Sequence, residues 1–496
     1  MLSKIKDTVK QTLIYSIGNI SSKLVGFILI PIYTKQLSVE EFGILSILEI
    51  SSQILIAFLG LSLHQGLTRW YWDIKNKEKQ KSTFFTILLF VTIFSATIII
   101  LLFIIRKQLS ILIFEDEIYQ YLIVLLLLSS GLQLISQLIT SLMRLQSKAL
   151  MFSITSLVRL LIALFLTIYL IIHLKRGVNG IYEAQIISYI IFLIITFNYL
   201  IKNINIRIDF QTLKEIIIFS YPLAISAVAA VLLNIADRYI IRYVAGFKET
   251  GIYSLGFKIS SLIKSIFMTS AQFAITPIVY KMVNDKNNTR FYSKLATYMT
   301  YAITLIALVV SIFSKELVVL LARKEDYLVA FKIIPILAVS LVIDQFRYNI
   351  AFGLNIAKKT YIMSIIIISV SIINIILNVI LISYFSIYGA AVATLISRII
   401  LCITYYYYSN KYYPVPYELI KIVKLIFLAT LFILSAMLLN DLNNYLLIIT
   451  IKTLILIVFP FTLYFLNFYD EKEIIALKGF WRKWKNPLKW KDNYRK

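Results

Sequence analysis

The fold is decided by residues 237–281, which read DRYIIRYVAGFKETGIYSLGFKISSLIKSIFMTSAQFAITPIVYK. After a charged and aromatic start, this stretch becomes apolar over a length that can cross a bilayer. Polar side chains recur along it at steps of three or four, which puts them on one helix face: Ser254, Lys258, Ser261, Ser265, Thr269 and Gln272. A lysine at mid-membrane depth costs about 2.5–3.5 kcal/mol on insertion scales. We therefore expect Lys258 to face a watery cavity.

The rest of the chain repeats this apolar pattern. Of its 496 residues, 60% are hydrophobic and 15% are charged, and apolar runs of bilayer length recur from Gln11 to Leu466. The sequence thus predicts an all-α membrane protein with about 14 transmembrane helices. The formal net charge of +25 comes from lysines and arginines in short loops and the tail, so we expect no nucleic-acid partner.

Cysteine and histidine are too sparse for a metal or disulfide framework. Cys402 is the single cysteine, and the two histidines, His64 and His173, are far apart. We expect no metal site and no cofactor.

Loop charge and loop length predict the topology. An even number of helices places both termini on one side, and the junctions on that side carry more lysine and arginine than those opposite. By the positive-inside rule we expect a multi-pass membrane protein with both termini cytoplasmic. The longest junction, from about Gly66 to Ser82, is too short for a soluble domain. Trp481, Trp484 and Trp490 alternate with basic residues in the tail, a pattern typical of interfacial anchoring on anionic lipid.

An internal repeat is visible when the chain is shifted by about 208 residues. Residues 41–46, EFGILS, then align with residues 249–254, ETGIYS, and Gly180–Ser188 aligns with Gly389–Ser397. Because such a shift contains six helices, the two halves have the same orientation, related by a pseudo-two-fold axis along the membrane normal. We expect two six-helix lobes, at 1–205 and 206–412, two further helices at 413–468, and a basic tail at 469–496.

Polar residues on other predicted helices form stripes similar to the one in residues 237–281. Their alternative role is hydrogen bonding between neighbouring helices. As the polar lining of a cavity we predict Asn19, Gln53, Gln133, Gln137, Ser254, Ser261 and Gln272.

Charged residues within the spans carry more weight, because burying them must be offset by a specific partner or function. The cations that we predict to bind substrate are Lys23, Arg159, Lys258, Lys264, Arg347 and Arg398. Asp344 is expected to pair with Arg347, and Glu49 with Lys23 or, across the pseudo-axis, with Lys258. Asp237, Arg238 and Arg242 are expected at the outer helix junction. Since Glu183 is then the only unpaired deep acid, the cavity should be net positive and the substrate anionic.

Three segments resemble a known family. Asp237-Arg238-Tyr239-Ile240 with Gly251-Ile252-Tyr253-Ser254, the opening Ile30-Pro31 with Glu41-Phe42-Gly43, and Tyr388-Gly389-Ala390-Ala391 are similar to the polysaccharide-biosynthesis flippases (Wzx-like O-antigen and capsule exporters). That family belongs to the multidrug/oligosaccharidyl-lipid/polysaccharide exporter superfamily. The resemblance implies that a polyprenyl-diphosphate-linked oligosaccharide crosses from the inner to the outer leaflet of the bacterial cytoplasmic membrane by alternating access through a cationic cavity.

One residue departs from the relatives that flip the peptidoglycan precursor. Those relatives place cations on the first, second and eighth helices, which fits Lys23 and Lys258, but the second helix here carries Glu49. This difference argues against the peptidoglycan precursor as substrate. Glu49 or Asp344 would suit the exchange of a coupling cation.

Two other functions compete with the flippase. A multidrug/cation antiporter of the same superfamily should display deep acids, whereas cations predominate here. A membrane glycosyltransferase or polymerase needs a sizeable outer loop, and none is long enough, so we expect no enzyme. The expected partners are the anionic lipid-linked glycan, the bilayer and glycan polymerases, with the protein itself a monomer.

Overall fold

The structure is a computed structural model, which describes residues 26–71, 74, 76–285, 288–441, 444–471 and 473–475. Over these residues the chain is helical and contains no strand. Asn19, Lys23 and most of the basic tail fall outside the described residues, so their predicted roles stay predictions.

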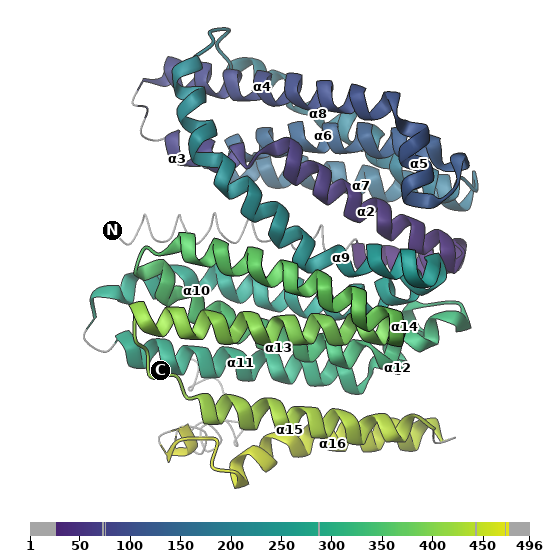
Figure 1. Cartoon of the computed structure of the whole chain (residues 1–496), viewed down its shortest axis with the longest axis vertical. Helices are drawn as coiled ribbons and strands as arrows, with labels where there is room; N and C mark the ends of the chain where they lie inside the picture. The colour runs from purple at the N-terminus through teal and green to yellow at the C-terminus, as the bar shows by residue number, and fades with distance from the viewer. Residues whose placement is uncertain are drawn as a thin grey trace, which may run out of the picture.

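The first half of the chain forms a bundle of long helices connected by short turns (Figure 1). Residues 26–36 are helical, and the helices that follow are α2 (Val39–Gly60), α3 (Leu63–Trp70), α4 (Lys77–Ile104), α5 (Arg106–Phe114), α6 (Gln120–Leu145), α7 (Ala149–Ile172) and α8 (Gly177–Lys202), with a short 3-10 helix η1 (Glu117–Tyr119). Ser38 begins α2 with a capping box. The Ser38 hydroxyl accepts a hydrogen bond from the Glu41 amide, and the Glu41 carboxylate accepts one from the Ser38 amide.

The second half contains the two longest helices. Its elements are α9 (Phe210–Leu262), a π-helical segment η2 (Ile263–Met268), α10 (Thr269–Lys281), η3 (Met282–Asn284), α11 (Asn288–Ile312), α12 (Ser314–Leu321), η4 (Glu325–Lys332), α13 (Ile334–Ile356), α14 (Thr360–Tyr412), α15 (Leu419–Met437), η5 (Leu438–Asp441) and α16 (Tyr445–Phe465).

Both 53-residue helices turn back on themselves. α9 breaks at Gly246, whose φ of 85° is readily available to glycine, and α14 breaks at Ser386, with φ 49°. At 1.5 Å per residue a straight helix of this length would extend about 80 Å, far beyond a hydrocarbon core of about 30 Å. Each therefore supplies two membrane-length segments, as the sequence predicts for its seventh and eighth and its eleventh and twelfth helices.

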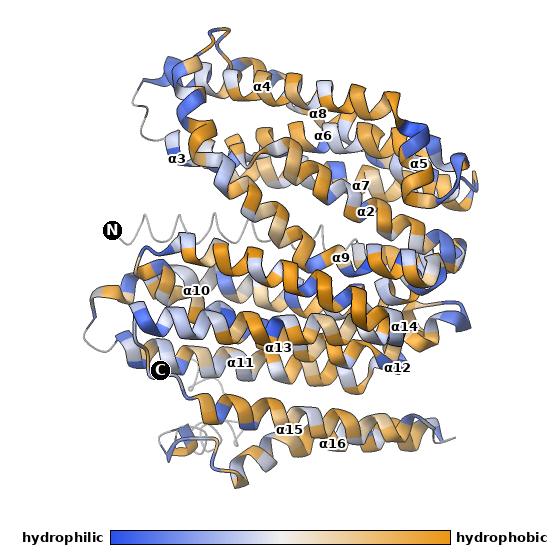
Figure 2. Cartoon of the chain, in the orientation of Figure 1, coloured by the Kyte–Doolittle hydropathy of each residue, from blue (hydrophilic) through white to orange (hydrophobic). Residues whose placement is uncertain are grey.

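Eleven described helices are long and apolar enough to cross a membrane. Figure 2 shows hydrophobic residues along the middle of the bundle and hydrophilic residues gathered at its two ends. The chain is thus a multi-pass membrane protein. The number of about fourteen stays a prediction, because the count of eleven takes α9 and α14 as one helix each and excludes residues 1–25.

α9 connects the two bundles. Leu213 and Ile216, near its start, pack in a core with Leu59 and Phe84, whereas Leu233 packs with Ile350. In Figure 1 the same helix runs diagonally from one bundle to the other. The last pair, α15 and α16, packs on the outer side of α11.

The bundles contact each other most closely where α2 crosses the second part of α9. A Cβ added to Gly43 would lie 2.1 Å from the Phe247 carbonyl oxygen, and one added to Gly251 would lie 2.2 Å from that of Val39. Only glycine permits this approach at either position. The two glycines occupy equivalent places in the predicted repeat, so the contact supports a pseudo-two-fold axis between them.

Candidate functional site

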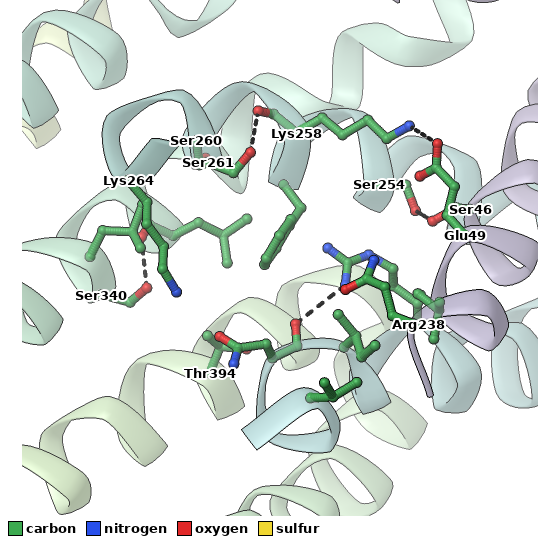
Figure 3. A pocket seen from close by; sticks show the side chains of 18 of the residues that line it. Ser46, Glu49, Arg238, Ser254, Lys258, Ser260, Ser261, Lys264, Ser340 and Thr394 are labelled. Atoms are coloured by element: carbon green, nitrogen blue, oxygen red, sulfur yellow. Dashed lines mark hydrogen bonds and ion pairs between the residues drawn. The ribbon is translucent and has the colours of Figure 1, made fainter. Parts of the chain in front are cut away.

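A cavity of about 470 Å³, here called the central cavity, lies beside this contact between the two bundles. α2, both parts of α9, η2, α13 and α14 line it. The polar side chains are Ser46, Glu49, Gln53, Asn234, Arg238, Ser254, Lys258, Ser260, Ser261, Lys264, Ser340, Thr394 and Arg398. Figure 3 shows that the labelled ones, among them Glu49, Arg238, Lys258 and Lys264, come from several helices and lie around one space.

Lys258 pairs with Glu49 across the boundary between the bundles. Its Nζ lies 2.9 Å from Glu49 Oε1, and the two side chains are 25% and 36% exposed. The predicted contact across the pseudo-axis is therefore present. The ammonium also lies 5.0 Å from the centre of the Phe42 ring, and both charges remain accessible from the cavity.

Arg238 lines the central cavity and not the outer helix junction, where the sequence pattern predicted it. The helix continues eight residues beyond it to the bend at Gly246, which is about 12 Å of rise. Arg238 is buried, donates to Asp237, and lies 3.8 Å from the Phe257 ring centre. The glycine at the bend is the sequence signal that would have located it. Arg242 does pair as expected, with Glu115 at 3.0 Å.

Asp344 connects two arginines. It accepts from Arg347 Nε at 2.8 Å, which confirms the predicted pair, and from Arg398 Nη1 at 3.4 Å. Arg398 also donates to Asn234 and lines the central cavity, whereas Arg347 and Asp344 lie behind it. The carboxylate thus balances part of the positive charge beside the cavity.

The π-helical segment alters the polar stripe predicted for residues 254–272. Lys264 lies within this segment and lines the central cavity. The Thr269 hydroxyl donates a hydrogen bond to the Lys264 backbone carbonyl. A π-bulge acts like one extra residue, which turns later side chains by about 100° relative to a continuous α-helix. Gln272, beyond the segment, accordingly lies outside the lining of the three cavities described here.

A second cavity, of about 500 Å³, adjoins the first and is called the adjoining cavity. It shares Glu49, Lys258 and Ser261 with the central cavity, and its far wall includes Gln133 and Arg159. The Arg159 guanidinium lies 4.8 Å from the Tyr189 ring centre. Arg159, in the first bundle, therefore lines the same connected cavities as Lys258, whereas Arg398 lines the central cavity from the second bundle.

A third cavity, of about 370 Å³, lies inside the first bundle between α3, α6, α7 and α8, and is called the N-lobe cavity. It shares Gln133, Arg159 and Tyr189 with the adjoining cavity. The full lining is His64, Gln133, Ser136, Gln137, Thr140, Ser141, Arg144, Phe152, Ser156, Arg159, Tyr189 and Phe192. Arg144, in the last turn of α6, was not among the cations predicted from the sequence to bind substrate.

The central site is net positive, as expected, although one premise was wrong. Glu183 is not unpaired: it accepts from Arg176 and from the Tyr121 hydroxyl. Around the central cavity five cations face three carboxylates; the cations are Arg238, Lys258, Lys264, Arg347 and Arg398, and the carboxylates are Glu49, Asp237 and Asp344. Within the described part of the chain, no three His, Cys, Asp or Glu side chains gather as a metal site.

Comparison with known proteins gives the family. Residues 8–283 match the family model described as polysaccharide biosynthesis protein, and residues 222–380 match the MatE family model. The Lsg locus protein 1 of Haemophilus influenzae is 22% identical over 286 residues, which cover 56% of this chain and 67% of that protein.

Two solved structures share the fold. The lipid II flippase MurJ in an inward closed conformation has a TM-score of 0.75 at 16% identity, covering 91% of this chain and 99% of that one. An inward-facing multidrug resistance MATE family transporter has a TM-score of 0.63 at 16% identity, covering 84% and 95%. The chain belongs to the polysaccharide biosynthesis protein family, and it has the fold of a lipid II flippase and of MATE family transporters.

Proposed function

We propose that this protein carries a polyprenyl-diphosphate-linked oligosaccharide from the inner to the outer leaflet of the cytoplasmic membrane. The observation that supports the proposal is the central cavity, which Arg238, Lys258, Lys264 and Arg398 line together. Figure 3 shows the first three. A diphosphate cannot cross hydrocarbon unaided, and cations in a low-dielectric cavity replace the water that it loses. The fold shared with a lipid II flippase supports the same kind of cargo.

The polar lining suits the glycan that the diphosphate carries. Each sugar hydroxyl costs several kcal/mol to bury without a partner, by water-to-hydrocarbon transfer. Gln53 lines the central cavity, Gln133 the adjoining and N-lobe cavities, and Gln137 the N-lobe cavity. No described residue hydrogen-bonds to their side-chain amides. Each amide offers two donors and an acceptor, so these side chains can replace water around the sugars.

Transport would proceed by alternating access of lobes 1–205 and 206–412. The contact of Gly43 with Gly251 closes one end of the interface, and the loops at the opposite end carry the larger share of lysine and arginine. By the positive-inside rule the opposite end is cytoplasmic, as are both termini, and the closed end is the outer one. The substrate would then reach the cavities from the cytoplasmic leaflet.

The membrane potential is a sufficient driving force. An inside-negative potential favours outward movement of an anion by about 2.3 kcal/mol per charge per 100 mV, and draws the emptied cationic site inward. Glu49, which is partly exposed in the cavity, is the candidate to exchange a cation during the return. Flipping in sealed vesicles should stop when the potential and all ion gradients are collapsed.

Deletion of the gene followed by mass analysis of lipid-linked glycans tests the proposal. We expect a lipid-linked glycan to accumulate in the inner leaflet, and complementation by the wild type but not by Lys258→Ala. The MatE match over residues 222–380 makes a multidrug antiporter the competing function. An unchanged lipid pool together with altered drug tolerance would favour that function.

A further inference from the structure

The N-lobe cavity is separate from the cationic cluster of the central cavity, yet it carries positive charge of its own. Arg144 comes from α6 and Arg159 from α7, and no Asp or Glu stands among the side chains that line it. Within the described chain, no carboxylate forms an ion pair with Arg159. Keeping arginine at this depth is costly unless a ligand or water compensates it.

The walls have the composition of a sugar site. Gln133 and Gln137 present amides, and hydroxyls lie beside them on the same face of α6. The Arg144 guanidinium donates to Ser141 and lies 5.7 Å from the Phe152 ring centre, while Arg159 lies over Tyr189. Rings on one side hold a planar guanidinium in a fixed plane, which favours the paired hydrogen bonds that carboxylates and phosphates accept.

The three cavities adjoin one another in a series. The central and adjoining cavities share Lys258, and the adjoining and N-lobe cavities share Arg159. In a lipid-linked glycan the sugars extend from the diphosphate. A diphosphate bound at the central cations would therefore place the sugars in the adjoining and N-lobe cavities.

We propose that the N-lobe cavity binds a negatively charged substituent, a carboxylate or a phosphate, on the sugar head, so that this translocase prefers acidic glycans. The inference rests on the proposed function. The amides and hydroxyls of the cavities provide hydrogen-bond partners for neutral sugars, and the cations of the central cavity provide the charge partners of the diphosphate. Arg144 and Arg159 are then the groups that an additional anion on the glycan would use.

The test is flipping in proteoliposomes of synthetic polyprenyl-diphosphate glycans that differ at one sugar: glucosyl, glucuronyl or phosphoglucosyl. We expect the wild type to flip at least one acidic lipid about tenfold faster than the glucosyl lipid, a ratio that corresponds to about 1.4 kcal/mol. Arg144→Gln should lose this preference, measured as the ratio of acidic to glucosyl flipping, and Arg144→Lys should keep part of it. Lys148→Gln removes an exposed charge four residues further along the chain, outside the cavity lining, and should behave as wild type.

Each contrary result has a separate meaning. Equal flipping of all three lipids by the wild type, with no effect of Arg144→Gln, would overturn the acidic preference and leave the proposed function intact. An equal loss for all three lipids in Arg144→Gln, at normal folding, would mean that the N-lobe cavity holds the diphosphate instead. No flipping of any lipid by the wild type would overturn the proposed function itself.

Discussion

Ser46 and Ser254 are 208 residues apart in the sequence, and their hydroxyl oxygens are hydrogen-bonded at 2.6 Å. Equivalent residues of two repeats can touch only where the axis that relates them passes between them. The bond therefore places the pseudo-two-fold axis at the crossing of α2 and α9, directly beside the central cavity. The same crossing contains Gly43 and Gly251. The closest contact between the bundles therefore lies next to the cationic cavity.

Closure at this crossing should depend on the two glycines. Gly251→Ala puts a methyl group against a backbone carbonyl, which cannot move aside as a side chain would. Overpacking of this kind costs about 1–3 kcal/mol, so we expect the closed end to open more often. The reporter is Ser46→Cys in a Cys402→Ser background. With Gly251→Ala added, this cysteine should react faster with an impermeant maleimide supplied outside than it does without that substitution. Gly26→Ala is the matched control, because an added Cβ there meets nothing within 4 Å; equal labelling of both variants would contradict the prediction.

A double-mutant cycle on Glu49 and Lys258 separates a structural ion pair from a substrate site. We expect Lys258→Gln to reduce flipping at least tenfold, because it removes a charge-assisted contact worth about 1.5–3 kcal/mol. If the ion pair served only for packing, Glu49→Gln combined with Lys258→Gln would restore much of the activity. We expect the double variant to remain as inactive as Lys258→Gln in the vesicle assay, at an unchanged unfolding temperature. Recovery in the double variant would reassign Lys258 to a structural role.

The sequence could predict this pair because the repeat and the helix period are both visible as patterns of residue types. The 208-residue shift aligns Ser46 with Ser254, and the polar stripe then puts Lys258 on the face that meets Glu49. The membrane class and the pairing of Asp344 with Arg347 follow from hydropathy and from the three-residue spacing.

Other features depend on backbone geometry that no residue pattern specified. The π-helical segment around Lys264 has the same apolar composition as its surroundings, so the rotation that moves Gln272 away was invisible. Arg238 was assigned to a loop because charged residues usually end a span, whereas the bend lies at Gly246. Arg144 was not predicted for the site because it lies in the last turn of α6, although it lines the N-lobe cavity.

A buried lysine in α16 should matter for stability rather than for transport. Lys452 is completely buried and donates to Glu316 of α12 at 2.6 Å and to Asn440 at 2.8 Å. Removing one partner of such a pair leaves a buried charge and costs about 3–5 kcal/mol. We expect Lys452→Met to lower the unfolding temperature in detergent, and Glu316→Gln with Lys452→Met to recover most of the loss. An unchanged unfolding temperature in the single variant would show that water replaces the pair.

Acid should weaken the attachment of the segment after α16, through Asp470. Hydrogen bonds from Lys294 and Lys421 lower the pKa of Asp470 to about 2. Since the usual value is about 3.9, the contribution to stability is complete above about pH 4 and disappears as the pH falls towards 2. The carboxylate is 41% exposed, so solvent screening limits the effect to about 1 kcal/mol. We expect the unfolding temperature of the wild type to fall more between pH 5 and pH 3 than that of Asp470→Asn, which lacks the titrating group. Glu117→Gln, which alters an exposed pair with Lys107 at 2.9 Å, should follow the wild type, and identical acid profiles for all three proteins would contradict the role of Asp470.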